Sequence, residues 1–144
     1  MMSVSPNRPF HLAFPVHNLK ETEDWYKTIL GCTVGRKSEK WIDFNFFGHQ
    51  ISAHLIDSKD NLKIVKNKVD SKDIPTRHFG IILTMLEWKS LAKSLEFNKV
   101  TFIVKPYIRF KGKKGEQATM FIKDPSDNYI EFKAFNDDRM IFDS

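Results

Sequence analysis

The sequence predicts an α+β fold in which one order of elements, βαβββ, occurs twice. Three observations predict it. Several short segments alternate apolar and polar residues, a pattern typical of half-buried strands. Two other segments place apolar residues three and four positions apart behind a capping pattern, which is typical of amphipathic helices. Both kinds of segment appear in the same order in each half of the 144-residue chain.

The first half opens with a predicted strand over residues 10–16, in which bulky apolar residues alternate with His11 and two smaller residues. Asn18 then stands at a helix N-cap position, with a glutamate three residues later to complete the capping-box spacing. Tryptophan, tyrosine, isoleucine and leucine form an apolar face over the predicted helix 19–30, and Gly31 is suited to end it. Three strands are expected to follow: Thr33–Lys37, Trp41–Phe47 and Gln50–Ile56.

A tight turn at Gly48-His49 is expected to join the last two of these strands. Residues 57–76 are polar and charged with weak periodicity. A connection of that length inside a compact domain is unusual, so we expect a linker or a functional lid.

The second half repeats the order. Its first predicted strand, Arg77–Leu83, carries His78 at the second position, as the strand over residues 10–16 carries His11. Thr84 and Glu87 have the capping-box spacing and precede a second apolar helical stripe. Three further strands are expected: Val100–Val104, Gln117–Lys123 and Tyr129–Phe135. A half of this size buries too little surface to be stable alone, so the two halves should pair.

Length and composition favour one domain over residues 1–144, with modules at about 9–56 and 77–135, a linker at 57–76 and a tail at 136–144. The formal charge of +5 is too small and too spread out to indicate nucleic acid binding. No apolar run is long enough to span a membrane, and the first nine residues do not resemble a secretion signal. The single cysteine fits a reducing compartment, so we expect a cytoplasmic protein.

The strand face opposite the helices gathers His11, His54, His78 and Glu131. Imidazole and carboxylate ligands suit a divalent first-row metal, and two histidines with one carboxylate leave coordination positions open for substrate. A lone strand histidine is more often a hydrogen-bonded or surface residue, and a lone strand glutamate is usually solvated. The repeated placement is what indicates a metal site. His17 and His49 are expected to face water and are left out of it.

The chain resembles the vicinal oxygen chelate superfamily, which includes glyoxalase I, bleomycin-resistance proteins, fosfomycin-resistance enzymes and type I extradiol dioxygenases. The similarity is carried by the stretches FHLAFPVHNLKETEDWYKTILGC, WIDFNFFGHQISAHL, RHFGIIL and GEQATMFIKDPSDNYIEFKAF. Within the superfamily it is most similar to a small, extradiol-dioxygenase-like branch. The resemblance implies that the two βαβββ modules form a curved eight-stranded mixed sheet with a metal-binding cup.

The resemblance also implies roles for individual residues. The Fe(II) ligands of extradiol dioxygenases correspond to His11, His78 and Glu131. His54 lies on the last strand of the first module, where dioxygenases hold an acid/base histidine and glyoxalase I holds a metal carboxylate. It is therefore either the acid/base residue or a fourth ligand. One departure is that the stretch KGKKGEQATMFIKD before Glu131 lacks the tyrosine and second histidine of the full-length dioxygenases.

Three functions follow as hypotheses. The first is Fe(II)-dependent ring-cleaving oxygenation of a catechol-like small molecule. The second is glyoxalase- or epimerase-like proton transfer assisted by a metal, for which Mn, Ni, Co or Zn would serve. The third is metal-free binding of a drug-like molecule. Exposed sheet edges and aromatic residues on the outer surface further favour a homodimer.

Overall fold

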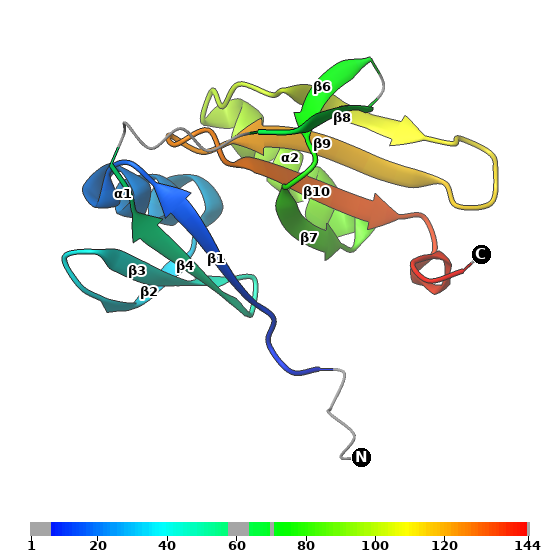
Figure 1. The fold of residues 1–144 in the computed structure, drawn as a ribbon. Helices are drawn as coiled ribbons and strands as arrows, with labels where there is room; N and C mark the ends of the chain where they lie inside the picture. Colours follow the sequence, from blue (N-terminus) through cyan, green and yellow to red (C-terminus); the bar gives the residue numbers. More distant parts are fainter. Residues whose placement is uncertain (1–6, 58–63, 70, 144) are drawn as a thin grey trace, which may run out of the picture. The chain divides into compact units, whose positions relative to one another are not determined.

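The computed structural model describes residues 7–57, 64–69 and 71–143, and Figure 1 shows their fold. The chain divides into two compact units, with the boundary between residues 61 and 62. None of the described helices is long and apolar enough to cross a membrane. The first unit contains one helix and four strands: β1 (His11–Val16), α1 (Leu19–Leu30), β2 (Thr33–Lys37), β3 (Trp41–Phe46) and β4 (His49–Leu55).

The strands of the first unit form one mixed sheet in the order β1-β4-β3-β2. The β1–β4 pair is parallel and the other two pairs are antiparallel. Helix α1 buries Tyr26, whose ring stacks on Phe44 of β3 at a centroid distance of 5.0 Å. The limits and caps of α1 are confirmed, because the Asn18 side chain accepts a hydrogen bond from the Glu21 amide and Gly31 is left-handed.

The second unit contains β7 (Phe79–Leu83), α2 (Met85–Phe97), β8 (Val104–Arg109), β9 (Gln117–Lys123), β10 (Tyr129–Phe135) and the short 3-10 helix η1 (Asp138–Met140). Its main sheet has the order β7-β10-β9-β8, again with the first pair parallel. The capping box of Thr84 and Glu87 is present at the start of α2. The helix packs on the sheet through buried Trp88, whose indole nitrogen donates to the Phe132 carbonyl oxygen at 2.9 Å.

The two sheets therefore share one topology, which confirms the α+β class and the repeated βαβββ order. Alternation fixes the buried face in both units. In β10, for example, Ile130, Phe132 and Ala134 are fully buried and the intervening residues are partly exposed. The union of both sheets around one cup remains a prediction.

One predicted strand is misplaced. The sequence pattern predicts a strand at 100–104, whereas β8 begins only at Val104. The Val100 amide is used to close the end of α2, because it donates to the Leu95 carbonyl at 3.0 Å. Pairing with β9 starts where Val104 lies opposite Phe121, and a bulge follows before Tyr107.

The turn between β3 and β4 is shifted by one residue from the predicted Gly48-His49. Its central residues are Phe47 and Gly48, with φ of 50° and 88°, and His49 already belongs to β4. Two positive φ values are typical of the tight turns that match the twist of paired strands. The His49 ring accepts a hydrogen bond from the Phe10 amide at 2.9 Å, so this histidine has a local structural role.

The connection predicted at 57–76 contains a hairpin, formed by β5 (Lys66–Val69) and β6 (Lys72–Pro75). It belongs to the second unit, where buried Ile74 packs with Val104 and Phe121. Because the hairpin buries so few apolar residues, the alternation was too weak to predict it. Residues 58–63 and 70 of this segment lie outside the described residues.

Candidate metal centre

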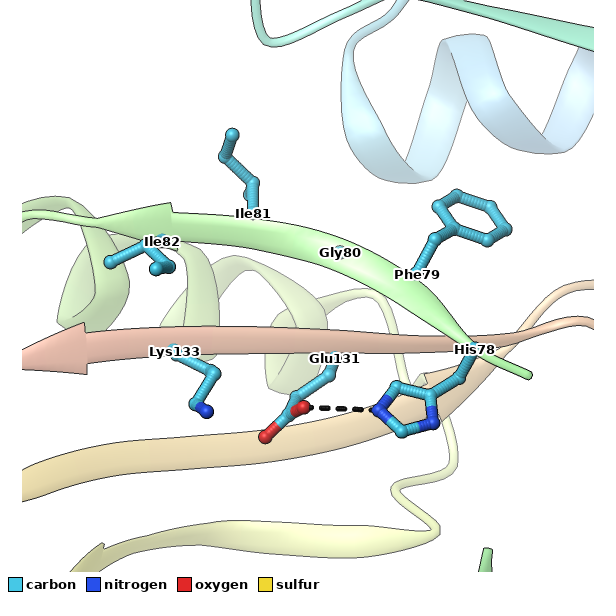
Figure 2. A pocket seen from close by; sticks show the side chains of 7 residues that line it. All are labelled: His78, Phe79, Gly80, Ile81, Ile82, Glu131 and Lys133. Carbon is cyan, nitrogen blue, oxygen red and sulfur yellow. Dashed lines mark hydrogen bonds and ion pairs between the residues drawn. The ribbon is translucent and has the colours of Figure 1, made fainter. Parts of the chain in front are cut away.

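His78 and Glu131 are in contact in the second unit. The distance from His78 Nε2 to Glu131 Oε2 is 3.3 Å, although the residues are 53 positions apart in sequence. Parallel pairing of β7 and β10 places Glu131 opposite Gly80, two residues after His78. Figure 2 shows both side chains on the same side of these strands, with Phe79 and Ile81 extending the other way. This brings together one predicted histidine and the predicted carboxylate, with His78 just before β7 rather than within it.

Neighbouring groups hold both side chains in place. The Thr119 hydroxyl on β9 donates to the other Glu131 oxygen, Oε1, at 2.7 Å. His78 Nδ1 lies 2.9 Å from the Pro75 carbonyl oxygen at the end of β6, and the Phe121 ring packs against the imidazole edge-on at 5.2 Å. The β5–β6 hairpin thus helps to orient His78. The side chains of His78 and Glu131 are 26% and 13% exposed, so a ligand can reach them.

The hydrogen bond to Pro75 determines which ring nitrogen of His78 carries the proton, and therefore which nitrogen faces Glu131. A carbonyl oxygen only accepts, so Nδ1 of His78 carries the proton there. In the neutral ring, Nε2 then presents a lone pair to the Glu131 carboxylate, which also has only lone pairs to offer. Two facing acceptors need a cation between them, either a proton or a metal ion. A carbonyl that orients the distal nitrogen is the usual support of a metal-binding histidine.

The other two predicted residues, His11 and His54, lie in the first unit and are exposed. Both are on the same face of the sheet, because β1 and β4 are paired in parallel with His11 opposite Gln50 and Pro15 opposite His54. They are therefore four residues apart along the strands, or about 13 Å at the usual rise of a strand. Strand side chains stand roughly perpendicular to the sheet, so this register favours separate roles for the two histidines.

The same register shows which residues of the two modules correspond. Glu131 lies opposite Gly80, two residues after His78, and Ser52 lies opposite Ala13, two residues after His11. Ser52 is thus the counterpart of Glu131. His54, two residues further on, is the counterpart of Lys133. The Ser52 hydroxyl donates to the buried Asp43 carboxylate at 2.5 Å, so this position carries a hydroxyl that is already engaged.

Among the residues that the structure describes, no three His, Cys, Asp or Glu side chains gather around one point. The His78–Glu131 pair supplies two of the three predicted ligands within one unit. His17 is exposed, as expected. Sequence reasoning missed the supporting Thr119 and the neighbouring Lys133. Counting by two along β10 places Lys133 on the face of Glu131, so that signal was present, whereas Thr119 reaches this face through the β9–β10 register.

Comparison with known proteins identifies the class. Residues 8–132 match the Glyoxalase/Bleomycin resistance protein/Dioxygenase superfamily. The chain is 35% identical to a glyoxalase/bleomycin resistance protein/dioxygenase from Alicyclobacillus acidocaldarius, with a TM-score of 0.78 over 96% of this chain and 98% of that one. The chain therefore belongs to this superfamily. A comparison with curated proteins gave no match.

More distant solved structures share the fold. A fosfomycin resistance protein, FosX, from Listeria monocytogenes is 16% identical, with a TM-score of 0.66 over 97% of this chain and 98% of that one. A lactoylglutathione lyase from Agrobacterium tumefaciens is 13% identical, with a TM-score of 0.61 over 90% of this chain and 94% of that one. At these identities the similarity extends to architecture alone.

Proposed function

We propose that this protein is a metal-dependent enzyme in which His11, His78 and Glu131 hold one divalent metal ion. The observation that carries the proposal is the pair of His78 Nε2 and Glu131 Oε2, two acceptors at 3.3 Å with the histidine oriented from behind by Pro75. Nitrogen and carboxylate donors suit Fe(II), which we favour, and also Mn, Ni, Co and Zn. His11 is assigned through its position in the repeat, equivalent to that of His78.

The reaction we propose is ring-cleaving oxygenation of a catechol-like small molecule. When bound, Fe(II) held by two histidines and one carboxylate supplies adjacent open positions for two substrate oxygens and for dioxygen. Thr119 keeps the Glu131 carboxylate oriented through its hydrogen bond at 2.7 Å. Phe121, packed against His78, limits the movement of the imidazole and excludes water from one side of it.

His54 is proposed as the acid/base residue that accepts a proton from the substrate hydroxyl. Its offset of four residues from His11 favours this role over that of a fourth ligand. An imidazole nitrogen can both accept and donate a proton, and the exposed side chain of His54 can be reached by a substrate.

A second candidate reaction is metal-assisted proton transfer of the glyoxalase or epimerase type. The residue of β9 that contacts the carboxylate is Thr119, whereas the full-length dioxygenases resembled by this chain carry a tyrosine and a second histidine on the strands before the glutamate. A hydroxyl at this point supports carboxylate orientation without supplying a further acid or base. In this reaction the metal polarises an oxygen next to the carbon that exchanges its proton.

The experiment is turnover after anaerobic reconstitution with Fe(II), Mn(II), Ni(II), Co(II) or Zn(II) in parallel. Oxygen uptake with a panel of catechols by the Fe(II) form alone, lost after exposure to air, supports ring cleavage. Solvent deuterium exchange into hydroxy- or oxo-acids by the Ni, Co or Zn forms supports proton transfer instead. His54→Ala should keep the metal and lose turnover in either case, whereas loss of the metal would make His54 a ligand.

We further propose that two chains pair as a homodimer and act in the cytoplasm, where a reducing environment preserves Fe(II). Exposed apolar side chains such as Leu86 and Phe97 of α2, at 80% and 86% exposed, are consistent with a protein surface that has a partner. Light scattering should give twice the 16.9 kDa chain mass at micromolar concentration. A mass equal to that of one chain would contradict pairing.

A further inference from the structure

We propose that Lys133 selects substrates that carry a carboxylate at the end opposite their metal-chelating oxygens. This inference rests on the proposed metal site and adds the class of substrate. Lys133 lines the same pocket as His78 and Glu131. It lies two residues after Glu131 on β10, which places the two residues on one face about 7 Å apart along the strand.

The charge of Lys133 is available to a ligand. One oxygen of Glu131 accepts a hydrogen bond from Thr119, and the other faces His78 Nε2 at 3.3 Å. Within the part of the chain that the structure describes, Lys133 makes no ion pair with an acidic side chain. Figure 2 shows its ammonium group on the same side of β7 and β10 as the His78 ring and the Glu131 carboxylate. A cation held there beside a metal ion gives the pocket a net positive charge.

The other residues that line the pocket indicate which carbon skeleton the ligand has. Gly80 lies between His78 and Ile82 in the pocket lining and contributes only backbone to it. Ile82 lies opposite Lys133 in the β7–β10 ladder and is 41% exposed, so its apolar surface is available for packing. The chemistry that fits this wall is a flat or apolar carbon skeleton, with chelating oxygens at the end near Glu131 and a negative group at the end near Lys133.

The test compares two catechols of matched shape. Dihydroxyphenylacetate carries a carboxylate where ethylcatechol carries a methyl group. Dissociation constants of both are measured by calorimetry under anaerobic conditions for the metal-loaded wild type, Lys133→Met and Lys133→Arg. Lys105→Met on the exposed part of β8 is the control for loss of a positive charge elsewhere. Melting curves of each loaded variant verify that it is folded.

In the wild type we expect the carboxylate to strengthen binding by about twofold to fivefold, the range of a partly exposed ion pair. Lys133→Met should bring the ratio of the two dissociation constants close to one, while Lys133→Arg and Lys105→Met keep it. If the ratio of the two dissociation constants is unchanged in Lys133→Met, or if the wild type binds both catechols equally, the proposed role of Lys133 is wrong. The proposed metal site would not be affected by that result. If the loaded protein binds neither catechol, the proposed catechol reaction fails and the role of Lys133 fails with it.

Discussion

A methyl group on Gly80 would lie 1.6 Å from the carbonyl oxygen of Glu131. The contact is with backbone rather than with a flexible side chain, so nothing can rotate away to relieve it. Strands β7 and β10 can hold their present separation only with glycine at position 80. The backbone of the proposed carboxylate ligand is therefore positioned by the absence of a side chain on the neighbouring strand.

Gly80→Ala should separate β7 from β10 and displace Glu131 from His78. We expect the free energy of unfolding to fall by about 2 kcal/mol or more, as for other forced overpacking, together with weaker metal binding. Gly35→Ala is the matched control, because a methyl group there meets its nearest atom, Asp43 Cβ, at an ordinary 3.5 Å. Urea denaturation of both variants measures the difference. Equal stability of the two would show that the β7–β10 contact is not as tight as described.

The thiol of the single cysteine, Cys32, should react very slowly with thiol reagents in the folded protein. Burial raises the pKa of the Cys32 thiol from its ordinary 9.0 to about 12. The thiolate is the reactive form, so at pH 8 an aromatic disulfide reagent should label the native chain very slowly and the urea-unfolded chain at once. Because the folded pKa is the higher one, the contribution of Cys32 to stability is present below pH 9 and is lost between pH 9 and 12. Rapid labelling of the native protein would contradict this environment.

The capping box of α2 provides a prediction that depends on pH. Hydrogen bonds from the Thr84 amide and hydroxyl lower the pKa of Glu87 below its usual 4.5. A lowered pKa adds stability above the unfolded value, and this stability is lost as the pH falls through the folded one. Glu87→Gln should therefore destabilise the protein at pH 7 and have little effect near pH 3.

The threonine of the same cap can be tested as well. Thr84→Ala removes the hydroxyl that accepts from the Glu87 amide and donates to the Glu87 carboxylate, and it should cost about 1 kcal/mol at pH 7. Ser90→Ala, at an exposed position inside α2, is the control and should be neutral or slightly stabilising. An effect of Glu87→Gln that is the same at both pH values would show that the charge of Glu87 does not contribute to the cap.

Most of the fold could be predicted because its signals are local. The caps at Asn18 and Thr84 and the strict alternation in β10 are set by residues within a few positions of each element. The start of β8 could not be predicted in this way, because Val100 is apolar like a strand residue while its amide binds the Leu95 carbonyl at the end of α2. The β5–β6 hairpin depends on packing of Ile74 against residues about 30 and 47 positions away, which no local pattern reveals.

The candidate site was predictable to the level of residue type and strand face. Period-two counting placed His78 and Glu131 on one face, and the structure brings their side chains into contact. It could not place Ser52, rather than His54, as the counterpart of Glu131, because that depends on the pairing register of separate strands. Nor could it show that Pro75 fixes the ring nitrogen of His78 that faces Glu131.

The most direct test of the account is the metal content of the protein after anaerobic loading with Fe(II) and desalting. Wild type and His17→Ala, a control histidine outside the proposed site, should retain about one ion per chain by elemental analysis. His11→Ala, His78→Ala and Glu131→Gln should each retain almost none while keeping native melting temperatures within a few degrees. Equal metal in His78→Ala and His17→Ala, or none in the wild type with any of the five metals, would contradict the proposed metal centre and favour metal-free binding of a small molecule.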